Sequence, residues 1–257
     1  MKITVLAENT AYDPRFQAEH GLSLYIETGD YKILFDMGQT DVFAKNAEAL
    51  DIDLSQVDFA VLSHGHYDHG GGLESFLRCN SNAPVFIHKL AFGDHYNGSE
   101  KYIGLQPALQ TETRLVFTEG EQSPAPGMIL SDCNDRNWAV CSWGLCRREQ
   151  NVLCHDLFAH EHYLQITEGQ KRILISGCSH KGIVNIADHF KPDILVGGFH
   201  LNKLEDHDQL CKIAETLKKT GATYYTGHCT GAVQFDTMKA IMGTQLQNIK
   251  TGMTIEI

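Results

Sequence analysis

The chain carries one segment of unusual composition, Ser63-His64-Gly65-His66-Tyr67-Asp68-His69-Gly70-Gly71-Gly72-Leu73. It follows the apolar run 59–62, which has the length of a buried strand. Imidazole nitrogen and carboxylate oxygen together suit zinc, iron or manganese. Because side chains alternate along an extended segment, His64 and His66 point the same way and can share one metal. We expect the chain then to turn, so that Asp68 and His69 approach a second metal.

A different interpretation of this segment is an exposed polar loop, or histidines that satisfy hydrogen bonds inside a core. That interpretation suits a lone histidine. Four potential ligands at this spacing, between an apolar strand and three consecutive glycines, favour a metal site. The glycines also permit a tight turn and the close approach of a following helix.

The rest of the chain predicts one continuous domain, 1–257, of mixed strands and helices. Strand patterns occupy 2–7, 22–28, 32–35, 172–175, 193–196 and 222–225, and helical patterns occupy 41–50, 205–220 and 232–242. Because these elements do not alternate as strict βαβ units, we expect two sheets covered by helices rather than one doubly wound sheet. The segment 119–150 is the least regular, and we predict a loop-rich insertion over a pocket there.

Composition limits the classes of partner. A net charge of -11 disfavours binding to nucleic acid or to an anionic membrane. It leaves room for a small anionic substrate, since a metal centre supplies positive charge locally. The start is too short and too polar for a signal peptide, and no run approaches the length of a membrane span. Eight cysteines in 257 residues do not indicate a disulfide scaffold, so we expect reduced thiols in a cytoplasmic protein.

The pattern His-x-His-x-Asp-His after a strand resembles the signature of the metallo-β-lactamase superfamily. Three later segments, 177–186, 197–201 and 228–231, resemble its methanopterin-synthase-like branch, together with 62–71. That branch includes the archaeal dihydropterin ribofuranosyl-aminobenzene phosphate synthase and bacterial metal-dependent hydrolases. The resemblance implies a four-layer αββα sandwich, of mixed α/β (α+β) class, with a metal site at one edge of its sheets.

The resemblance also implies two divalent metal ions, zinc first, with manganese or iron as alternatives. The implied ligands are His64, His66, Asp68, His69, His180 and His228. Asp36, at the end of the strand 32–35, is similar to the superfamily's aspartate that orients a ligand histidine by hydrogen bonding. A turn residue at a strand end is the alternative interpretation of Asp36.

The third ligand of the first metal is open at this point. We favour His180, which follows the strand 172–175 and a turn of small residues. Cys178 stands where many superfamily members have a bridging aspartate, and a thiolate is a good zinc ligand. A small buried thiol fits the same pattern. The upstream histidine that is usual in the superfamily has no clean match here, which makes His155 and Asp156 further candidates.

Other potential site residues are less distinctive. His200 follows an apolar strand and two glycines, and we interpret it as facing the pocket, where it contacts substrate or stabilises developing charge. A plain loop histidine is the alternative. Cys133, Cys141, Cys146 and Cys154 lack a paired zinc spacing. We treat them as ordinary thiols, with a structural metal site as the rival interpretation.

These observations predict a hydrolase in which two metals lower the pKa of a water molecule and Asp68 steers the resulting hydroxide. The expected substrate is a small phosphoester or pyrophosphate-like molecule. The alternative is a transferase of the methanopterin-synthase type, in which an aromatic amine displaces pyrophosphate from a pterin. A noncatalytic metal-binding module is a third possibility. A redox di-iron role is disfavoured, because the diiron flavoproteins of the superfamily have glutamate at the position of His66.

Overall fold

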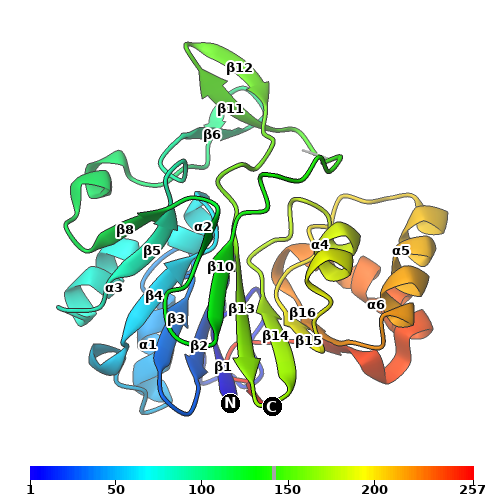
Figure 1. Cartoon of the computed structure of the whole chain (residues 1–257), viewed down its shortest axis with the longest axis horizontal. Helices are drawn as coiled ribbons and strands as arrows, with labels where there is room; N and C mark the ends of the chain where they lie inside the picture. Colours follow the sequence, from blue (N-terminus) through cyan, green and yellow to red (C-terminus); the bar gives the residue numbers. More distant parts are fainter. Residues whose placement is uncertain (141–142) are drawn as a thin grey trace.

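The computed structural model describes residues 1–140 and 143–257. Two seven-stranded sheets form its middle layers, with helices on their outer faces (Figure 1). The first sheet contains, in spatial order, β18 (Thr254–Glu256), β1 (Lys2–Ala7), β2 (Ser23–Glu27), β3 (Lys32–Phe35), β4 (Phe59–Leu62), β5 (Val85–His88) and β8 (Leu115–Thr118). The second contains β17 (Leu246–Asn248), β16 (Thr223–Thr226), β15 (Ile194–Val196), β14 (Lys171–Ile175), β13 (Tyr163–Glu168), β10 (Met128–Ser131) and β9 (Glu121–Gln122). The expected αββα sandwich is thereby confirmed.

Alternation along the strands explains the layers. In β14, Ile173 and Ile175 pack in the core between the two sheets, while Leu174 packs in the core between the second sheet and its helices. In β1, Ile3 and Val5 likewise face the other sheet, and Leu6 faces the helices of the first sheet. Both faces of these strands are therefore buried, which is why their sequences lack the regular alternation of apolar and polar residues found in half-exposed strands.

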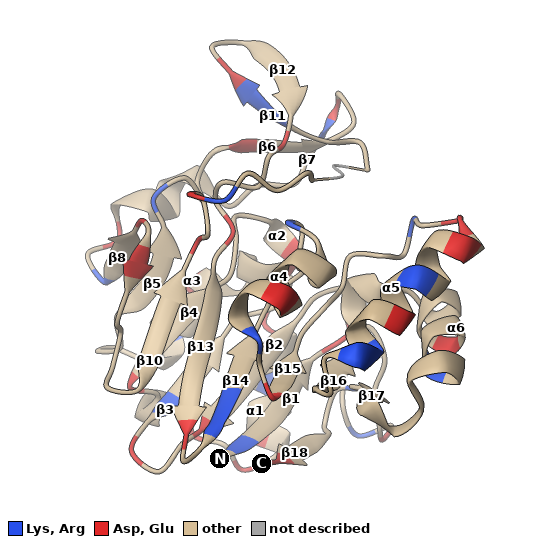
Figure 2. Cartoon of the chain, turned by 45° about the vertical axis from the view of Figure 1, so that its right-hand side comes forward, with Lys and Arg blue, Asp and Glu red and all other residues tan. Residues whose placement is uncertain are grey.

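Helices α1 (Val42–Ala49) and α3 (Leu73–Cys79) cover the first sheet, and α4 (Ile183–Phe190), α5 (His207–Lys219) and α6 (Ala232–Met242) cover the second. The pattern at 205–220 predicted α5 closely. The helix begins after Asp206, whose side chain accepts a hydrogen bond from the Gln209 amide, and it ends before Gly221 at a φ of 77°. Acidic and basic positions are interspersed along α5 in Figure 2. Within the described residues, no helix has the length and apolar character needed to cross a membrane.

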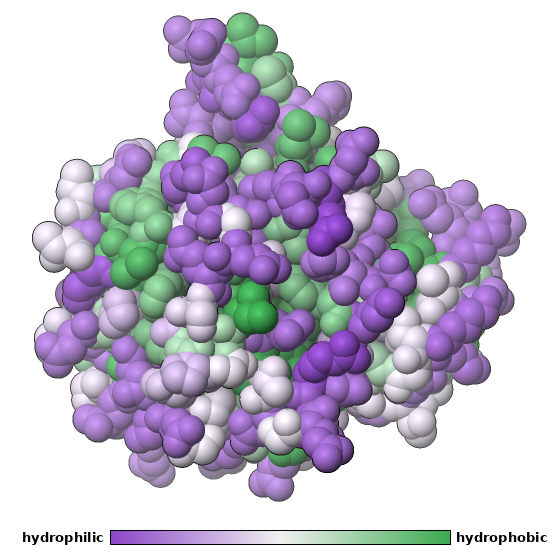
Figure 3. All heavy atoms as spheres, in the orientation of Figure 1, coloured by the Kyte–Doolittle hydropathy of each residue, from purple (hydrophilic) through white to green (hydrophobic). Residues whose placement is uncertain are grey.

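A small third sheet stands over one end of the sandwich (Figures 1 and 2). It contains β12 (Val152–His155), β11 (Leu145–Glu149), β6 (Asp94–Asn97) and β7 (Lys101–Tyr102). The segment 119–150 is divided between two sheets, because β9 and β10 extend the second sheet and β11 joins the small one. Figure 3 shows a mostly hydrophilic face of the molecule, with hydrophobic atoms on the small sheet, where Val152 and Leu153 are exposed.

Parallel strands place the site. β3 and β4 run parallel in the first sheet, and β14, β15 and β16 run parallel in the second. The carboxyl ends of parallel strands open onto the same edge of a sheet, where ligands of open α/β sheets usually bind. The short helices α2 (Tyr67–Gly70) and η3 (His228–Thr230) lie just beyond these ends. Within the described residues, three other 3-10 helices occupy Leu54–Gln56, Pro107–Thr111 and Gly243–Gln245.

Candidate metal centre

Asp36 orients two histidines of the motif from the end of β3. Its buried carboxylate accepts hydrogen bonds from the Ser63 amide at 2.7 Å, from the Ser63 hydroxyl at 2.7 Å and from His69 Nδ1 at 2.6 Å. Because the Ser63 hydroxyl donates its one proton to Asp36, its oxygen accepts from His64 Nδ1, at 2.8 Å. His64 and His69 therefore carry their protons on Nδ1 and present the Nε2 lone pairs to the site.

His228 is oriented in the same way by Asn9. The Asn9 Oδ1 atom accepts a hydrogen bond from the Gly21 amide at 3.3 Å, which identifies it as the oxygen of the side-chain amide. The same oxygen lies 3.0 Å from His228 Nδ1, so this nitrogen is the donor and Nε2 has the lone pair. Asn9 lies far from the motif in the sequence, and no local pattern marked it.

The second half of the site gathers Asp68, His69, Cys178 and His228. His69 Nε2 lies 3.1 Å from His228 Nε2 and 3.1 Å from Cys178 Sγ. Asp68 Oδ2 lies 3.3 Å from His228 Nε2 and 3.8 Å from His69 Nε2. Two imidazole lone pairs that face each other at 3.1 Å, beside a carboxylate, repel unless a positive charge lies among them. The donor atoms therefore fit a divalent metal of the kind that binds nitrogen, oxygen and sulfur.

The first half gathers His64, His66 and His180. His64 Nε2 lies 3.4 Å from His180 Nε2, and the His66 ring lies 4.6 Å from the His64 ring and 5.1 Å from the His180 ring, between centroids. The His180 ring stacks on Phe158, at 4.1 Å and an angle of 6°. Among the described residues, His66 Nε2 and His180 Nδ1 are buried without a hydrogen-bond partner. Cys178 also has a donor atom within 4.8 Å of those of His64 and His180, so it lies between the two halves.

Electrostatics keep these imidazoles neutral and the Asp68 carboxylate ionised. Burial, with a smaller effect from neighbouring imidazoles, lowers the pKa values of His64, His66 and His180 well below the usual range, so their lone pairs are available. Burial alone would raise the pKa of Asp68, but His69, His20 and His228 hold it well below its ordinary value.

Two further ligand candidates, His69 and Cys178, respond to burial in different ways. Burial opposes the charged form of His69, yet Asp36 and Asp68 outweigh it and raise its pKa. Burial raises the pKa of the Cys178 thiol well above its ordinary range. Cys178 is therefore a neutral thiol without a metal, and a cation beside it would favour the thiolate.

His200 lies beside the first half of the site. It follows β15 at a φ of 50°, and its ring centroid is 4.1 Å from that of His180. Both of its ring nitrogens are buried and lack a partner within the part of the chain that is described. Its amide donates to Cys229 Sγ at 3.2 Å, and a side chain at Gly198 would collide with that sulfur. His200 thus faces the pocket with unused hydrogen-bonding capacity.

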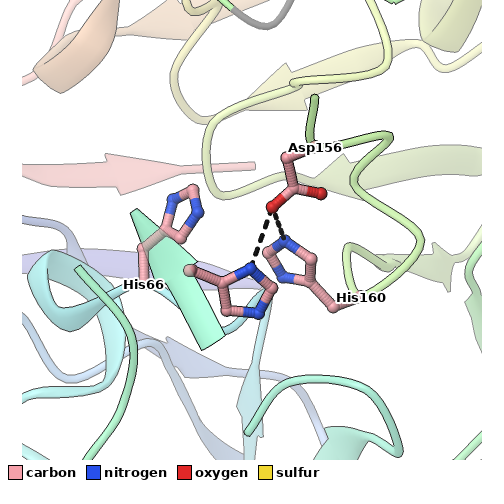
Figure 4. A group of neighbouring side chains, drawn as sticks. His66, Asp156 and His160 are labelled. Atoms are coloured by element: carbon pink, nitrogen blue, oxygen red, sulfur yellow. Dashed lines mark hydrogen bonds and ion pairs between the residues drawn. The ribbon is translucent and has the colours of Figure 1, made fainter. Parts of the chain in front are cut away.

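The upstream candidates lie in different environments. His155 is exposed on β12, whereas the other ligand candidates are mostly buried. Asp156 is 1% exposed, and its Oδ2 atom accepts hydrogen bonds from His95 Nδ1 at 2.9 Å and His160 Nε2 at 3.2 Å. Figure 4 shows His66 beside Asp156 and His160. His95, on β6, was missed because it is an isolated histidine in the sequence, and only the small sheet brings it to this place.

Three other cysteines that the sequence singled out, Cys133, Cys146 and Cys154, lie outside the groups of potential metal ligands in the described residues. Cys133 is buried beside Ser131, and Cys146 and Cys154 lie on neighbouring strands of the small sheet. Cys141 falls outside the described residues.

A pocket of about 140 Å³ opens over the centre. The residues that line it come from both sheets' loops and from the small sheet: His20, His66, Tyr67, Asp68, Asn97, Lys101, Ile103, Leu145, Cys178, His180, His200, Asn202, Lys203 and Cys229. A cavity of about 150 Å³ holds a molecule the size of benzene. The pocket therefore admits one end of a small substrate.

Comparisons with known proteins agree with this geometry. Residues 17–129 match the family described as the metallo-beta-lactamase superfamily. An uncharacterized protein of Methanocaldococcus jannaschii, MJ0448, is 33% identical over 89% of this chain and 90% of its own. The 7,8-dihydropterin-6-methyl-4-(beta-D-ribofuranosyl)-aminobenzene-5'-phosphate synthase of the same organism is 30% identical over 90% of this chain and 88% of its own. The crystal structure of Tm1679, a metal-dependent hydrolase of the beta-lactamase superfamily, superimposes with a TM-score of 0.85 and 31% identity, covering 100% of this chain and 99% of that one. The chain belongs to the metallo-β-lactamase superfamily.

Proposed function

We propose that this protein is a metal-dependent hydrolase that holds two divalent ions, zinc in the first instance, and cleaves a small phosphoester or pyrophosphate-like substrate. The observation that carries the proposal is the convergence of two groups of donor atoms on one pocket that also presents two lysines. Metal ions bound there supply a water molecule of lowered pKa and positive charge opposite the substrate anion.

The lysines support an anionic substrate. Lys101, on β7, lies over the Tyr67 ring at 5.4 Å and donates to its hydroxyl at 3.4 Å. Lys203 donates to the Trp143 carbonyl at 3.0 Å. Both line the pocket, in a chain whose net charge is -11. Cations that line a cleft concentrate anions there, even when the whole protein is acidic.

Other residues of the pocket have complementary tasks. Asp68 lines the pocket with an ionised carboxylate, which can accept a hydrogen bond from the attacking water and orient it. His200 presents two buried ring nitrogens that have no partner in the described structure, one of which can donate to a developing negative charge. The Phe158 ring holds His180 in place by stacking.

The experiment begins with elemental analysis of protein purified without added metal, followed by assays on phosphodiesters, pyrophosphates and lactones. We expect two metal ions per chain and turnover of a phosphorus ester. Lys101→Gln and Lys203→Gln should raise KM for that ester, whereas Lys212→Gln, on the outer helix α5, should not. Faster turnover of neutral lactones than of any phosphorus compound would overturn the proposed substrate class.

The relation to the M. jannaschii synthase supports a second candidate, a transferase in which an aromatic amine displaces pyrophosphate from a pterin. Both reactions require the same arrangement for holding an anion, so the donor atoms alone do not separate them. Pyrophosphate release that depends on an added aromatic amine would favour the transferase. Release in water alone would favour the hydrolase.

A further inference from the structure

A buried hydrogen-bond network lies behind His66, centred on Asp156. Besides His95 Nδ1 and His160 Nε2 on Oδ2, the carboxylate accepts the Phe158 amide on Oδ1 at 2.7 Å. Burial alone would raise the pKa of Asp156, but His160 and His95 hold it far below the ordinary value. The group is therefore a carboxylate with three donors around it, buried below the small sheet.

The backbone determines which nitrogen of His160 carries the proton. The Gly65 amide donates to His160 Nδ1 at 2.9 Å, so Nδ1 has the lone pair and Nε2 has the hydrogen that reaches Asp156. His160 Nε2 is then unavailable as a neutral metal ligand. This argues against a metal ion held by the whole group of His66, His95, Asp156 and His160, although one donor atom of each lies within 4.8 Å of the others.

Two nitrogens of this group lack a partner in the described chain, His66 Nε2 and His95 Nε2, and both are buried. The two rings lie 5.5 Å apart between centroids, at 75°. Because His95 donates to Asp156 through Nδ1, its Nε2 has a lone pair. His66 lines the pocket while its Nε2 is buried without a partner, which leaves Nδ1 as the ring nitrogen that could bind a metal ion in the pocket.

We propose that His95 is a positioning residue for His66: when His66 binds metal through Nδ1, its Nε2–H donates to His95 Nε2, which Asp156 orients from the other side. The proposal rests on the proposed metal site at His66. A ligand histidine that donates its second N–H is fixed in tautomer and orientation, and loss of such a partner weakens metal binding. His95 lies on β6 and Asp156 directly follows β12, so the sheet that covers the pocket also orients a ligand.

The test compares His95→Leu, which removes the hydrogen bond to Asp156 and the proposed acceptor for His66, with His95→Gln, whose amide retains an acceptor and a donor. His88→Leu is the matched control, because His88 is equally buried and bonds Asp132 at 3.1 Å, but no contact joins it to His66 in the described structure. Metal content and dissociation constants are measured by elemental analysis and chelator competition with zinc, and melting temperature is measured without metal.

We expect His95→Leu to bind two ions, one of them about 10- to 100-fold more weakly. His95→Gln should recover part of the zinc affinity. His88→Leu should keep the zinc affinity of the wild type, although its melting temperature should fall by about as much as that of His95→Leu. Unchanged zinc affinity in folded His95→Leu would overturn the proposal. It would also be overturned if His95→Leu lost one ion completely and bound the rest with unchanged affinity, because the group around Asp156 would then itself bind a metal. If His95→Leu does not fold, Asp156→Asn serves in its place. Wild-type protein that binds no metal at all would instead refute the proposed function and this inference together.

Discussion

Asp36 Oδ2 and His69 Nδ1 are 2.6 Å apart, and both side chains are completely buried. This contact joins the end of β3 to the short helix α2, which follows β4. Asp36 reaches it from a backbone with a φ of 56°, a conformation that few residues other than glycine adopt without strain. The same carboxylate also bonds Ser63, and through Ser63 it determines the tautomer of His64. One buried side chain thus orients a histidine in each half of the site.

Replacement of Asp36 by asparagine should weaken metal binding in both halves. Three donors meet at this side chain, and asparagine offers them one acceptor oxygen and an NH₂ group. At least one buried donor therefore loses its partner, which lowers the free energy of unfolding by about 1–3 kcal/mol. We expect about 10- to 100-fold weaker zinc affinity by chelator competition. Asp132→Asn, which alters the buried pair with His88 away from the centre, should lower stability but leave zinc affinity unchanged.

Cobalt substitution should reveal the thiolate. Cys178 Sγ lies 3.1 Å from His69 Nε2, so a metal bound among Asp68, His69 and His228 has this sulfur within reach. We expect a thiolate-to-cobalt charge-transfer band in the near ultraviolet, lost in Cys178→Ser. It should persist in Cys133→Ser, another buried cysteine. A band that survives in Cys178→Ser would exclude Cys178 as its source.

Acid should destabilise the metal-free protein before its carboxylates titrate. Burial lowers the pKa of His160 to about 4 and of His162 to about 3. Between these values and about 6.5, the unfolded chain binds protons that the folded chain excludes, so the free energy of unfolding falls as pH falls. His162→Gln should reduce this slope in urea titrations at pH 7, 6 and 5, in the presence of a chelator. Exposed His207→Gln should leave the slope unchanged. Equal slopes for both variants would contradict the assignment to His162.

Gly65 should not tolerate a side chain. A Cβ atom there would collide with the backbone carbonyl of Ala91. Unlike the end of a flexible side chain, this backbone group cannot move aside at low cost. Gly65→Ala should therefore cost about 1–3 kcal/mol of stability, as overpacking of a core does. It should also weaken zinc binding, because Gly65 lies between His64 and His66. Gly29→Ala, at a position with open space, is the control for both measurements in urea titration and chelator competition.

Several features of the structure could be predicted from residues that are neighbours in the sequence. The motif at 63–73 places its potential ligands after one buried strand, and in the structure these residues do lie together at the end of β4. The helix α5 was predictable because its apolar period and both of its ends are encoded within its own residues. In each case the residues that predict the element lie within that element or next to it. His180 and His228 lie far from the motif in the sequence, and only the resemblance to the superfamily indicated them as potential ligands.

Tertiary structure alone decided the remainder. Within 119–150, β10 is a strand because it pairs with β13, and the pattern of its own residues gave no sign of that partner. His95 approaches His66 because β6 pairs with β11, which lies about fifty positions further along the chain. Asn9 and His228 are still further apart. Hydrophobic period records which face of an element is buried, but it does not record which distant element covers that face. The sequence alone therefore determined the superfamily and the motif of potential ligands, while the side chains that orient those residues depend on contacts that form when the sheets assemble.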